Sequence, residues 1–169
     1  MKRAVIVVLL IGLISFKSPA QVHKFKAIFV YKLMQNIQWP QTKAQEKYKL
    51  GIVGKDDIEK YLNEIFETRK VNNKSVEVRI YKPGESVEGF HMIYVPDKSK
   101  AAVDGLREEA RKHAVVLVGE SPGIAQQGAN LNLLTDGGKL KFEMNKAYFD
   151  QSNIKVQNTM SSLAILVEE

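Results

Sequence analysis

Residues 49–80 carry the strongest fold signal in the chain, KLGIVGKDDIEKYLNEIFETRKVNNKSVEVRI. They open with an apolar run, Lys49 to Val53, which predicts a buried strand. A helix is expected next, because Asp56 and Glu59 have capping-box spacing and apolar residues then recur at helical intervals: Ile58, Tyr61, Leu62, Ile65 and Phe66. A second strand is predicted where Val76, Val78 and Ile80 alternate with charged residues. The order strand, helix, strand indicates an α/β fold.

Upstream of this unit, an amphipathic helix is expected from His23 to Gln38. Its apolar residues repeat at steps of three and four: Phe25, Ile28, Phe29, Leu33 and Ile37. Trp39-Pro40 should end it, because the residue before a proline is pushed out of helical geometry.

Downstream, strands and helices continue to alternate. A short strand is predicted from His91 to Val95, and a helix capped by Asp97 or Ser99 should run to His113. The residues from Ala114 to Val118 form the most apolar predicted strand. Two further strands, 130–134 and 140–144, flank an Asp-Gly pair, which is a strong hairpin signal. Two helical pieces close the chain, residues 146–151 and about 158–167.

These elements predict one domain, residues 21–169, with a three-layer α/β/α sandwich. Its sheet should be mixed but mostly parallel, with a C-terminal hairpin. The composition agrees, since 44% of the 169 residues are hydrophobic and 26% are charged. Cysteine is absent, which excludes disulfides, zinc–thiolate sites, iron–sulfur clusters and cysteine nucleophiles.

The first twenty residues have the layout of a secretory signal peptide. Lys2 and Arg3 precede an uncharged, apolar run from Ala4 to Phe16, and small residues follow at Ser18 and Ala20. The run is shorter than the roughly 20 residues that a membrane-spanning helix needs. We therefore expect export, cleavage after Ala20 and no stable membrane insertion afterwards, with an uncleaved N-terminal anchor as the alternative.

Removing this segment also removes three cations and no acid, which lowers the net charge from +6 to +3. That balance is too mild to indicate nucleic acid as a partner, and no cluster of Lys and Arg with interleaved aromatic residues is present.

The sharpest catalytic signal is Gly119-Glu120-Ser121-Pro122-Gly123, which matches the G-x-S-x-G pattern of a serine hydrolase. Pro122 opposes this interpretation, because a proline has no N–H to donate to an oxyanion. The three histidines also precede Ser121, whereas the hydrolase order places the catalytic histidine after the serine. A strand followed by a Ser-Pro-Gly turn is therefore the favoured interpretation.

Metal and phosphate sites are also not predicted. The histidines are far apart and lack helical i, i+4 partners, and His91 is expected to be a hydrogen-bonded core residue. The turn from Gly51 to Asp57 lacks P-loop spacing, and its two carboxylates would repel an anion. The sequence thus predicts no catalytic residue, no metal and no cofactor.

Several local motifs, in order, resemble the YfiR/HmsC-like family of periplasmic proteins. The helix from Lys26 to Trp39-Pro40 resembles the family's opening Lys-Ala-x-Phe helix with its Trp-Pro end. Segments 50–56 and 90–95 are similar to its first strand and turn and to its short Cys/His-containing strand. Phe142 and Asn145 match its Leu-x-Phe-x-(Ile)-Asn element, and residues 154–166, which include Leu163, approximate its closing helix.

The resemblance implies a non-enzymatic regulator. Family members bind the periplasmic sensor domain of an inner-membrane diguanylate cyclase, or accompany membrane histidine kinases, and alter cyclic-di-GMP and biofilm output. A second copy of the chain is a further candidate partner. Redox sensing through cysteine pairs, found in some members, is excluded here. The alternatives are a periplasmic small-molecule-binding module, with a pocket at the carboxyl ends of the strands, and a hydrolase using Ser121.

Five residues are singled out by the resemblance as structural or partner-binding: Trp39, Pro40, Phe142, Asn145 and Leu163. Trp39 and Phe142 are expected in the core, and Asn145 is expected to cap the helix that follows it. We place the partner surface between Lys139 and Leu166. The five apolar residues from Leu163 to Val167 are more than one helix face can bury, so they are either wholly core, which we favour, or partly turned toward a partner.

Overall fold

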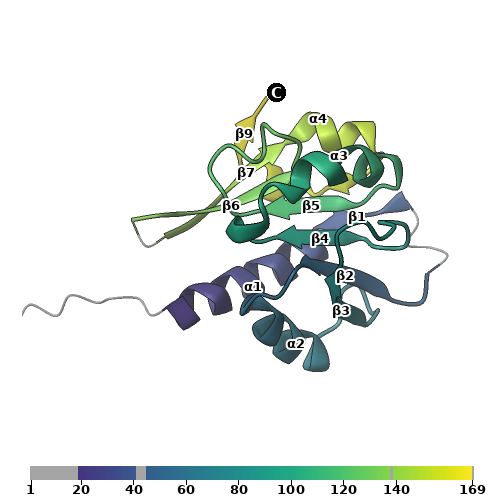
Figure 1. Cartoon of the computed structure of the whole chain (residues 1–169), viewed down its shortest axis with the longest axis vertical. Helices are drawn as coiled ribbons and strands as arrows, with labels where there is room; N and C mark the ends of the chain where they lie inside the picture. Colours follow the sequence, from purple (N-terminus) through teal and green to yellow (C-terminus); the bar gives the residue numbers. More distant parts are fainter. Residues whose placement is uncertain (1–18, 41–44, 138, 169) are drawn as a thin grey trace, which may run out of the picture.

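The computed structural model describes residues 19–40, 45–137 and 139–168 (Figure 1). Its elements, in chain order, are α1 (Pro19–Gln35), β1 (Ile37–Gln38), β2 (Tyr48–Val53), α2 (Ile58–Thr68), β3 (Val76–Tyr81), β4 (Met92–Val95), the 3₁₀ turn η2 (Asp97–Ser99), α3 (Ala102–Lys112), β5 (Val116–Gly119), β6 (Leu131–Asp136), β7 (Lys139–Asn145), α4 (Lys146–Gln151), β8 (Lys155–Val156), α5 (Asn158–Ser161) and β9 (Ile165–Val167). The expected signal peptide lies mostly outside the described residues.

Seven strands form one sheet in the order β3-β2-β4-β5-β6-β7-β9. The five strands from β3 to β6 are parallel to their neighbours, β7 is antiparallel to β6, and β9 is parallel to β7. A second, small sheet joins β1 to β8. The predicted single-domain α/β fold with a mostly parallel mixed sheet is therefore confirmed.

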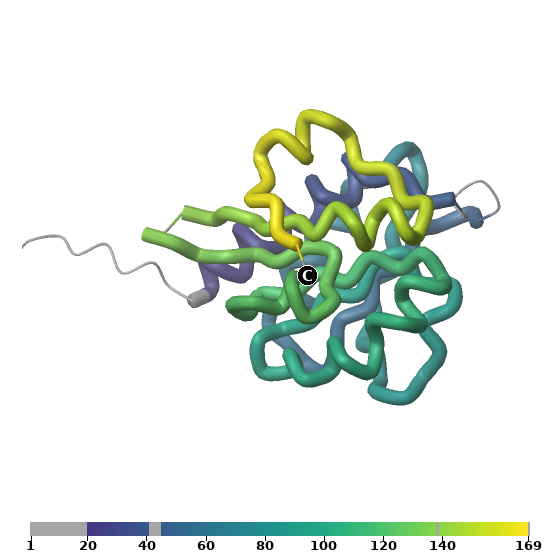
Figure 2. The backbone as a smooth tube through the Cα atoms, turned by 90° about the horizontal axis from the view of Figure 1, so that it is seen from above, coloured from purple at the N-terminus to yellow at the C-terminus, as the bar shows by residue number. Residues whose placement is uncertain are grey.

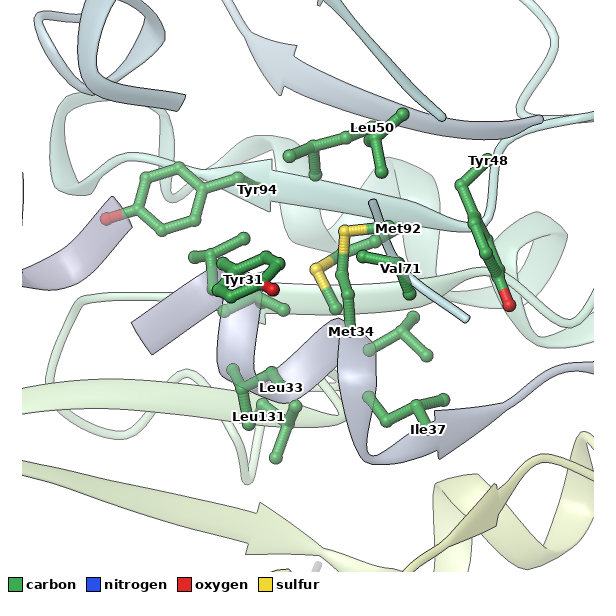
Figure 3. Packing of buried hydrophobic residues seen from close by; sticks show 14 of the residues in the cluster. Tyr31, Leu33, Met34, Ile37, Tyr48, Leu50, Val71, Met92, Tyr94 and Leu131 are labelled. Atoms are coloured by element: carbon green, nitrogen blue, oxygen red, sulfur yellow. The ribbon is translucent and has the colours of Figure 1, made fainter. Parts of the chain in front are cut away.

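Helices cover both faces of the sheet, which gives the expected layers. The larger hydrophobic cluster packs α1 and α2 against one face, through strand residues such as Leu50, Met92 and Tyr94 (Figure 3). The smaller cluster packs α3 against the other face, through Ile93 and Leu117 among others. Alternate residues of β4 thus enter different layers, because successive side chains of a strand point to opposite faces.

The strand, helix and strand at residues 49–80 form as expected, although Asp57 rather than Asp56 occupies the N-cap position of the helix. The two strands pair in parallel from Tyr48 with Val76 to Val53 with Tyr81. At the start of the helix between them, Asp56 Oδ1 accepts a hydrogen bond from the Ile58 N–H at 3.1 Å. The predicted hairpin is also confirmed, with Asp136 opposite Lys139. Gly137, at φ +54°, adopts a left-handed conformation that favours glycine.

The first helix ends earlier than the sequence predicts, at Gln35 rather than Gln38. Ile37 and Gln38 instead pair with Val156 and Lys155 in the small antiparallel sheet. The apolar period alone could not show this, because the strand partner lies more than a hundred residues away.

The prediction of a closing helix over residues 158–167 is wrong. Only Asn158–Ser161 is helical, and Ile165–Val167 is a strand that pairs with Glu143–Asn145 of β7. Five consecutive apolar residues fit a strand as well as a helix, and the free edge of β7 supplies the hydrogen bonds that decide between them.

Candidate functional site

Trp39 and its neighbours form a buried aromatic cluster. Only 4% of Trp39 is exposed, and its ring centroid lies 5.5 Å from that of Tyr48 and 5.7 Å from that of His91. Pro40, which follows, is exposed. The Trp-Pro motif therefore fixes where the chain leaves the core after β1, with the tryptophan inside and the proline outside.

His91 is the hydrogen-bonded core residue that the sequence predicts. Its side chain is fully buried, and Nδ1 accepts a hydrogen bond from the Lys49 N–H at 3.1 Å. Burial, with smaller contributions from the charges of Lys74 and Lys49, lowers the pKa of His91 to about 4. The ring is consequently neutral near pH 7 and serves as a packing element.

The two family-motif residues of β7 are both buried. The Phe142 ring lies 5.2 Å from the ring of Phe29 and so fastens α1 to the sheet. Asn145 precedes α4 but makes no side-chain cap, and the expectation that it caps this helix is wrong. Its Nδ2 instead donates to the Ala125 carbonyl at 3.3 Å, which ties the end of β7 to the turns after β5.

Leu163 lies in an exposed apolar group. Its exposed fraction is 73%, against 45% for Ile165 and 60% for Leu166. We call these three residues the C-terminal apolar patch. The favoured expectation of a wholly buried run is therefore wrong, and the alternative, in which part of the run faces outward, holds.

The G-x-S-x-G match has structural explanations in this fold. The residues after Ser121 form turns rather than the helix that a nucleophile elbow requires. A Cβ on Gly119 would lie 2.4 Å from Ile124 Cγ2, so only glycine allows this close packing. Ser121 is itself 1% exposed, and its hydroxyl donates to Asp97 Oδ1 at 2.6 Å.

Glu120 organises the carboxyl ends of β4 and β5. Its Oε2 accepts hydrogen bonds from Lys26 Nζ at 2.6 Å and from the Tyr94 hydroxyl, and its Oε1 accepts one from the Asp97 N–H at 2.9 Å. Burial raises the pKa of Tyr94 well above its usual value, and the Glu120 charge adds to that rise. Lys26 belongs to α1, so this network holds the helix across the strand ends.

The crevice between β2 and β4 is closed by side chains. This is where the strand order reverses, which is the usual ligand position in an open α/β sheet. Here Lys98 Nζ lies 3.0 Å from Asp56 Oδ2, and Ser99 Oγ donates to the Val53 carbonyl at 3.2 Å. The strand ends are thus joined to each other, and a solvent-open hollow of polar residues remains beside them, next to the start of α2.

A different, apolar groove lies between α1 and the β6–β7 hairpin. It measures about 340 Å³, and we call it the α1–hairpin groove; its lining is Val22, Phe25, Ile28, Phe29, Lys32, Thr135 and Leu140. The N-terminal end of α1 and the tip of the hairpin project on the same side of the molecule (Figure 2). Two groove residues have large exposed fractions, 46% for Phe25 and 38% for Ile28.

The described residues lack a metal-ligand cluster and a membrane-spanning helix. Their His, Asp and Glu side chains do not gather in threes as a metal ion would require. Among their helices, none combines the length and apolar character needed to cross a membrane.

Comparison with known proteins identifies one matching family and one solved structure with a similar fold. The model of a family described as YfiR/HmsC-like matches residues 23–165. A crystal structure of a conserved domain protein from Vibrio cholerae O1 biovar eltor is similar with a TM-score of 0.58 at 13% identity. The match covers 89% of this chain and 60% of that one, and at this identity it supports the fold alone. Comparison with curated proteins gives no match.

Proposed function

The chain belongs to the YfiR/HmsC-like family, and on that basis we propose that it is a periplasmic, non-enzymatic regulator. In this proposal it binds the periplasmic domain of an inner-membrane signalling protein, a diguanylate cyclase or a histidine kinase. Binding then modulates cyclic-di-GMP and biofilm signalling.

The C-terminal apolar patch is the observation that carries this proposal. Leu163 and Leu166 are 73% and 60% exposed, whereas the other leucines that the structure describes are buried or half-buried. Large apolar side chains that are exposed close together in the chain favour a protein contact, because covering them removes apolar area from water.

The backbone beneath the patch supports the same proposal. β9 is the last strand of the sheet and pairs on one side with β7. Its other side presents N–H and C=O groups at an edge, which a partner can meet by adding a strand. Main-chain hydrogen bonds would set the register, and Ile165 and Leu166 would contribute contacts from opposite faces.

The alternative of a ligand pocket at the strand ends has less support. The Lys98–Asp56 ion pair and the Ser99–Val53 hydrogen bond occupy the switch-point crevice. A ligand there would have to displace both.

Gene deletion and pulldown test the proposal. If the protein is a repressor, deleting its gene should raise cyclic-di-GMP or kinase output. The mature protein should recover an inner-membrane signalling protein through the periplasmic domain of that protein. The double variant Leu163→Ser/Leu166→Ser should lose this recovery while keeping the wild-type melting temperature, because both side chains are exposed. Glu67→Ser, an exposed change on α2, is the control and should retain recovery.

Two outcomes contradict the proposal. One is unchanged recovery of the partner by the double variant, which removes the patch from the interface. The other is a change of oligomeric state in the double variant, measured by light scattering, without loss of the partner. In that case a second copy of the chain covers the patch.

A further inference from the structure

We propose that the α1–hairpin groove binds a free fatty acid. The carboxylate would meet Lys32, and the acyl chain would lie along α1 toward Val22. This site is separate from the C-terminal apolar patch and does not depend on the proposed regulatory partner.

The lining and length of the groove suit an acyl chain. Five of its seven lining residues are apolar, and two of these, Phe25 and Phe29, are aromatic. Its volume of about 340 Å³ lies in the range of small-ligand sites. Val22 and Lys32 are ten residues apart on one helix, so the groove extends about 15 Å along α1 at 1.5 Å per residue. That is the length of a medium-length acyl chain.

The polar groups of the groove suit an anionic head. Lys32 is the one charged residue of the lining, and it forms no ion pair with any residue that the structure describes. Its Nζ also lies 5.6 Å from the centroid of the ring of Tyr31, its neighbour in α1. Thr135, the other polar residue of the lining, belongs to the hairpin and not to α1. Among the described lining residues, no carboxylate competes for Lys32.

The same lining argues against a peptide as the occupant. Each residue of a bound peptide brings an N–H and a C=O that need partners once they leave water. Among the described residues that line the groove, only Lys32 and Thr135 have polar side chains. An acyl chain has no such requirement beyond its head group, and a single chain fits a groove one helix face wide.

Binding of straight-chain carboxylates tests this assignment. The protein, as purified from the cell, is titrated calorimetrically with octanoate, decanoate, dodecanoate and tetradecanoate below their micelle concentrations. Full burial of one methylene group raises the affinity about fourfold. Burial of half of its surface, with the other half still exposed to water, raises the affinity about twofold. We expect affinity to rise about twofold per methylene and to level off once the chain exceeds the groove.

Two pairs of variants test the roles of the residues. Lys32→Met should weaken dodecanoate binding about tenfold, because a charge-assisted hydrogen bond is lost. It should leave the binding of uncharged dodecanol unchanged. Lys24→Met, an exposed change on the same helix but outside the lining, should bind dodecanoate as the wild type does. Phe25→Glu should abolish the binding of both dodecanoate and dodecanol. Phe25→Leu, which keeps the groove apolar, should retain the binding of both.

The outcomes separate the fatty acid from other occupants. The proposal is overturned if dodecanoate does not bind at micromolar concentration, or if it binds equally to the wild type, Lys32→Met and Phe25→Glu. It is also overturned if a photo-crosslinker placed at Ile28 in living cells yields a protein adduct rather than a fatty acid adduct by mass spectrometry. If the protein binds phospholipid vesicles and free dodecanoate does not compete with that binding, the groove is assigned to a membrane surface instead.

Discussion

Ser121 illustrates how a surrounding fold gives a residue its role. The hydroxyl donates to a carboxylate of Asp97, and the side chain is 1% exposed. The sequence suggests a surface turn, where replacing the serine would shift stability by only a few tenths of a kcal/mol. Burial corrects that expectation, because the change removes a charge-assisted hydrogen bond that the buried hydroxyl donates to the exposed carboxylate of Asp97.

Ser121→Ala should therefore lower the free energy of unfolding by about 1–2 kcal/mol, measured by urea denaturation. It should leave biological activity intact, since the serine is not expected to be a nucleophile. Labelling of Ser121 by a fluorophosphonate probe, lost in this variant, would contradict that second part.

His91 makes stability depend on pH in a defined direction. Its pKa is about 4 in the folded protein and about 6.5 in an unfolded chain. Between these values the unfolded state binds more protons, so the free energy of unfolding falls as the pH falls from about 6.5 to 4. The loss attributable to this residue is on the order of 3 kcal/mol at pH 4.

Urea denaturation at several pH values tests this contribution. His91→Gln should show a shallower decline in stability between pH 6.5 and 4 than the wild type, because glutamine cannot gain the proton. His113→Gln makes the same chemical change on a partly exposed side chain and should decline as the wild type does. Identical profiles for all three proteins would show that His91 does not resist protonation.

At the scale of elements, α1 is held to the sheet by a polar contact as well as by its apolar face. Lys26 and Glu120 are 94 residues apart, and their side chains are 14% and 8% exposed. A charge left alone in such a place is costly, although the intact pair need not stabilise more than an apolar pair would.

Lys26→Met should therefore lower the free energy of unfolding by about 3 kcal/mol, measured by urea denaturation. Adding Glu120→Gln to it should recover part of that loss, because the unpaired charge is removed. Lys146→Met is the matched control: its partner Asp150 lies at 2.8 Å, but both side chains are 64% exposed, so the loss should stay below about 1 kcal/mol. Equal losses for the two lysine variants would mean that Lys26 is solvated.

At the scale of the whole molecule, export remains a prediction from the first twenty residues. Cleavage after Ala20 would remove the first two residues of α1 and leave Val22, at the end of the α1–hairpin groove, as the second residue of the mature chain. N-terminal sequencing of the periplasmic fraction should find Gln21 first. A membrane-retained protein that still begins at Met1 would show that the apolar run is an uncleaved anchor.

The sequence by itself determined the elements whose signals are local. Residues 49–80 contain the strand periods and the capping carboxylate of one strand–helix–strand unit, and Asp136-Gly137 specifies the hairpin. These signals act between residues a few positions apart, so they can be seen without knowledge of the rest of the chain. The burial of Trp39, Phe142 and His91 follows from the same patterns, because each lies in or beside an apolar element.

Only the tertiary structure decided the features that depend on distant partners. Residues 163–167 have no local preference strong enough to choose between helix and strand, and the free edge of β7 makes 165–167 a strand with outward-facing side chains. The α1–hairpin groove likewise needs two segments that are about a hundred residues apart in the chain. A hydrogen bond or a groove wall that comes from a segment so distant in the chain produces no periodic pattern in the local sequence, because the two segments meet only once the sheet has formed.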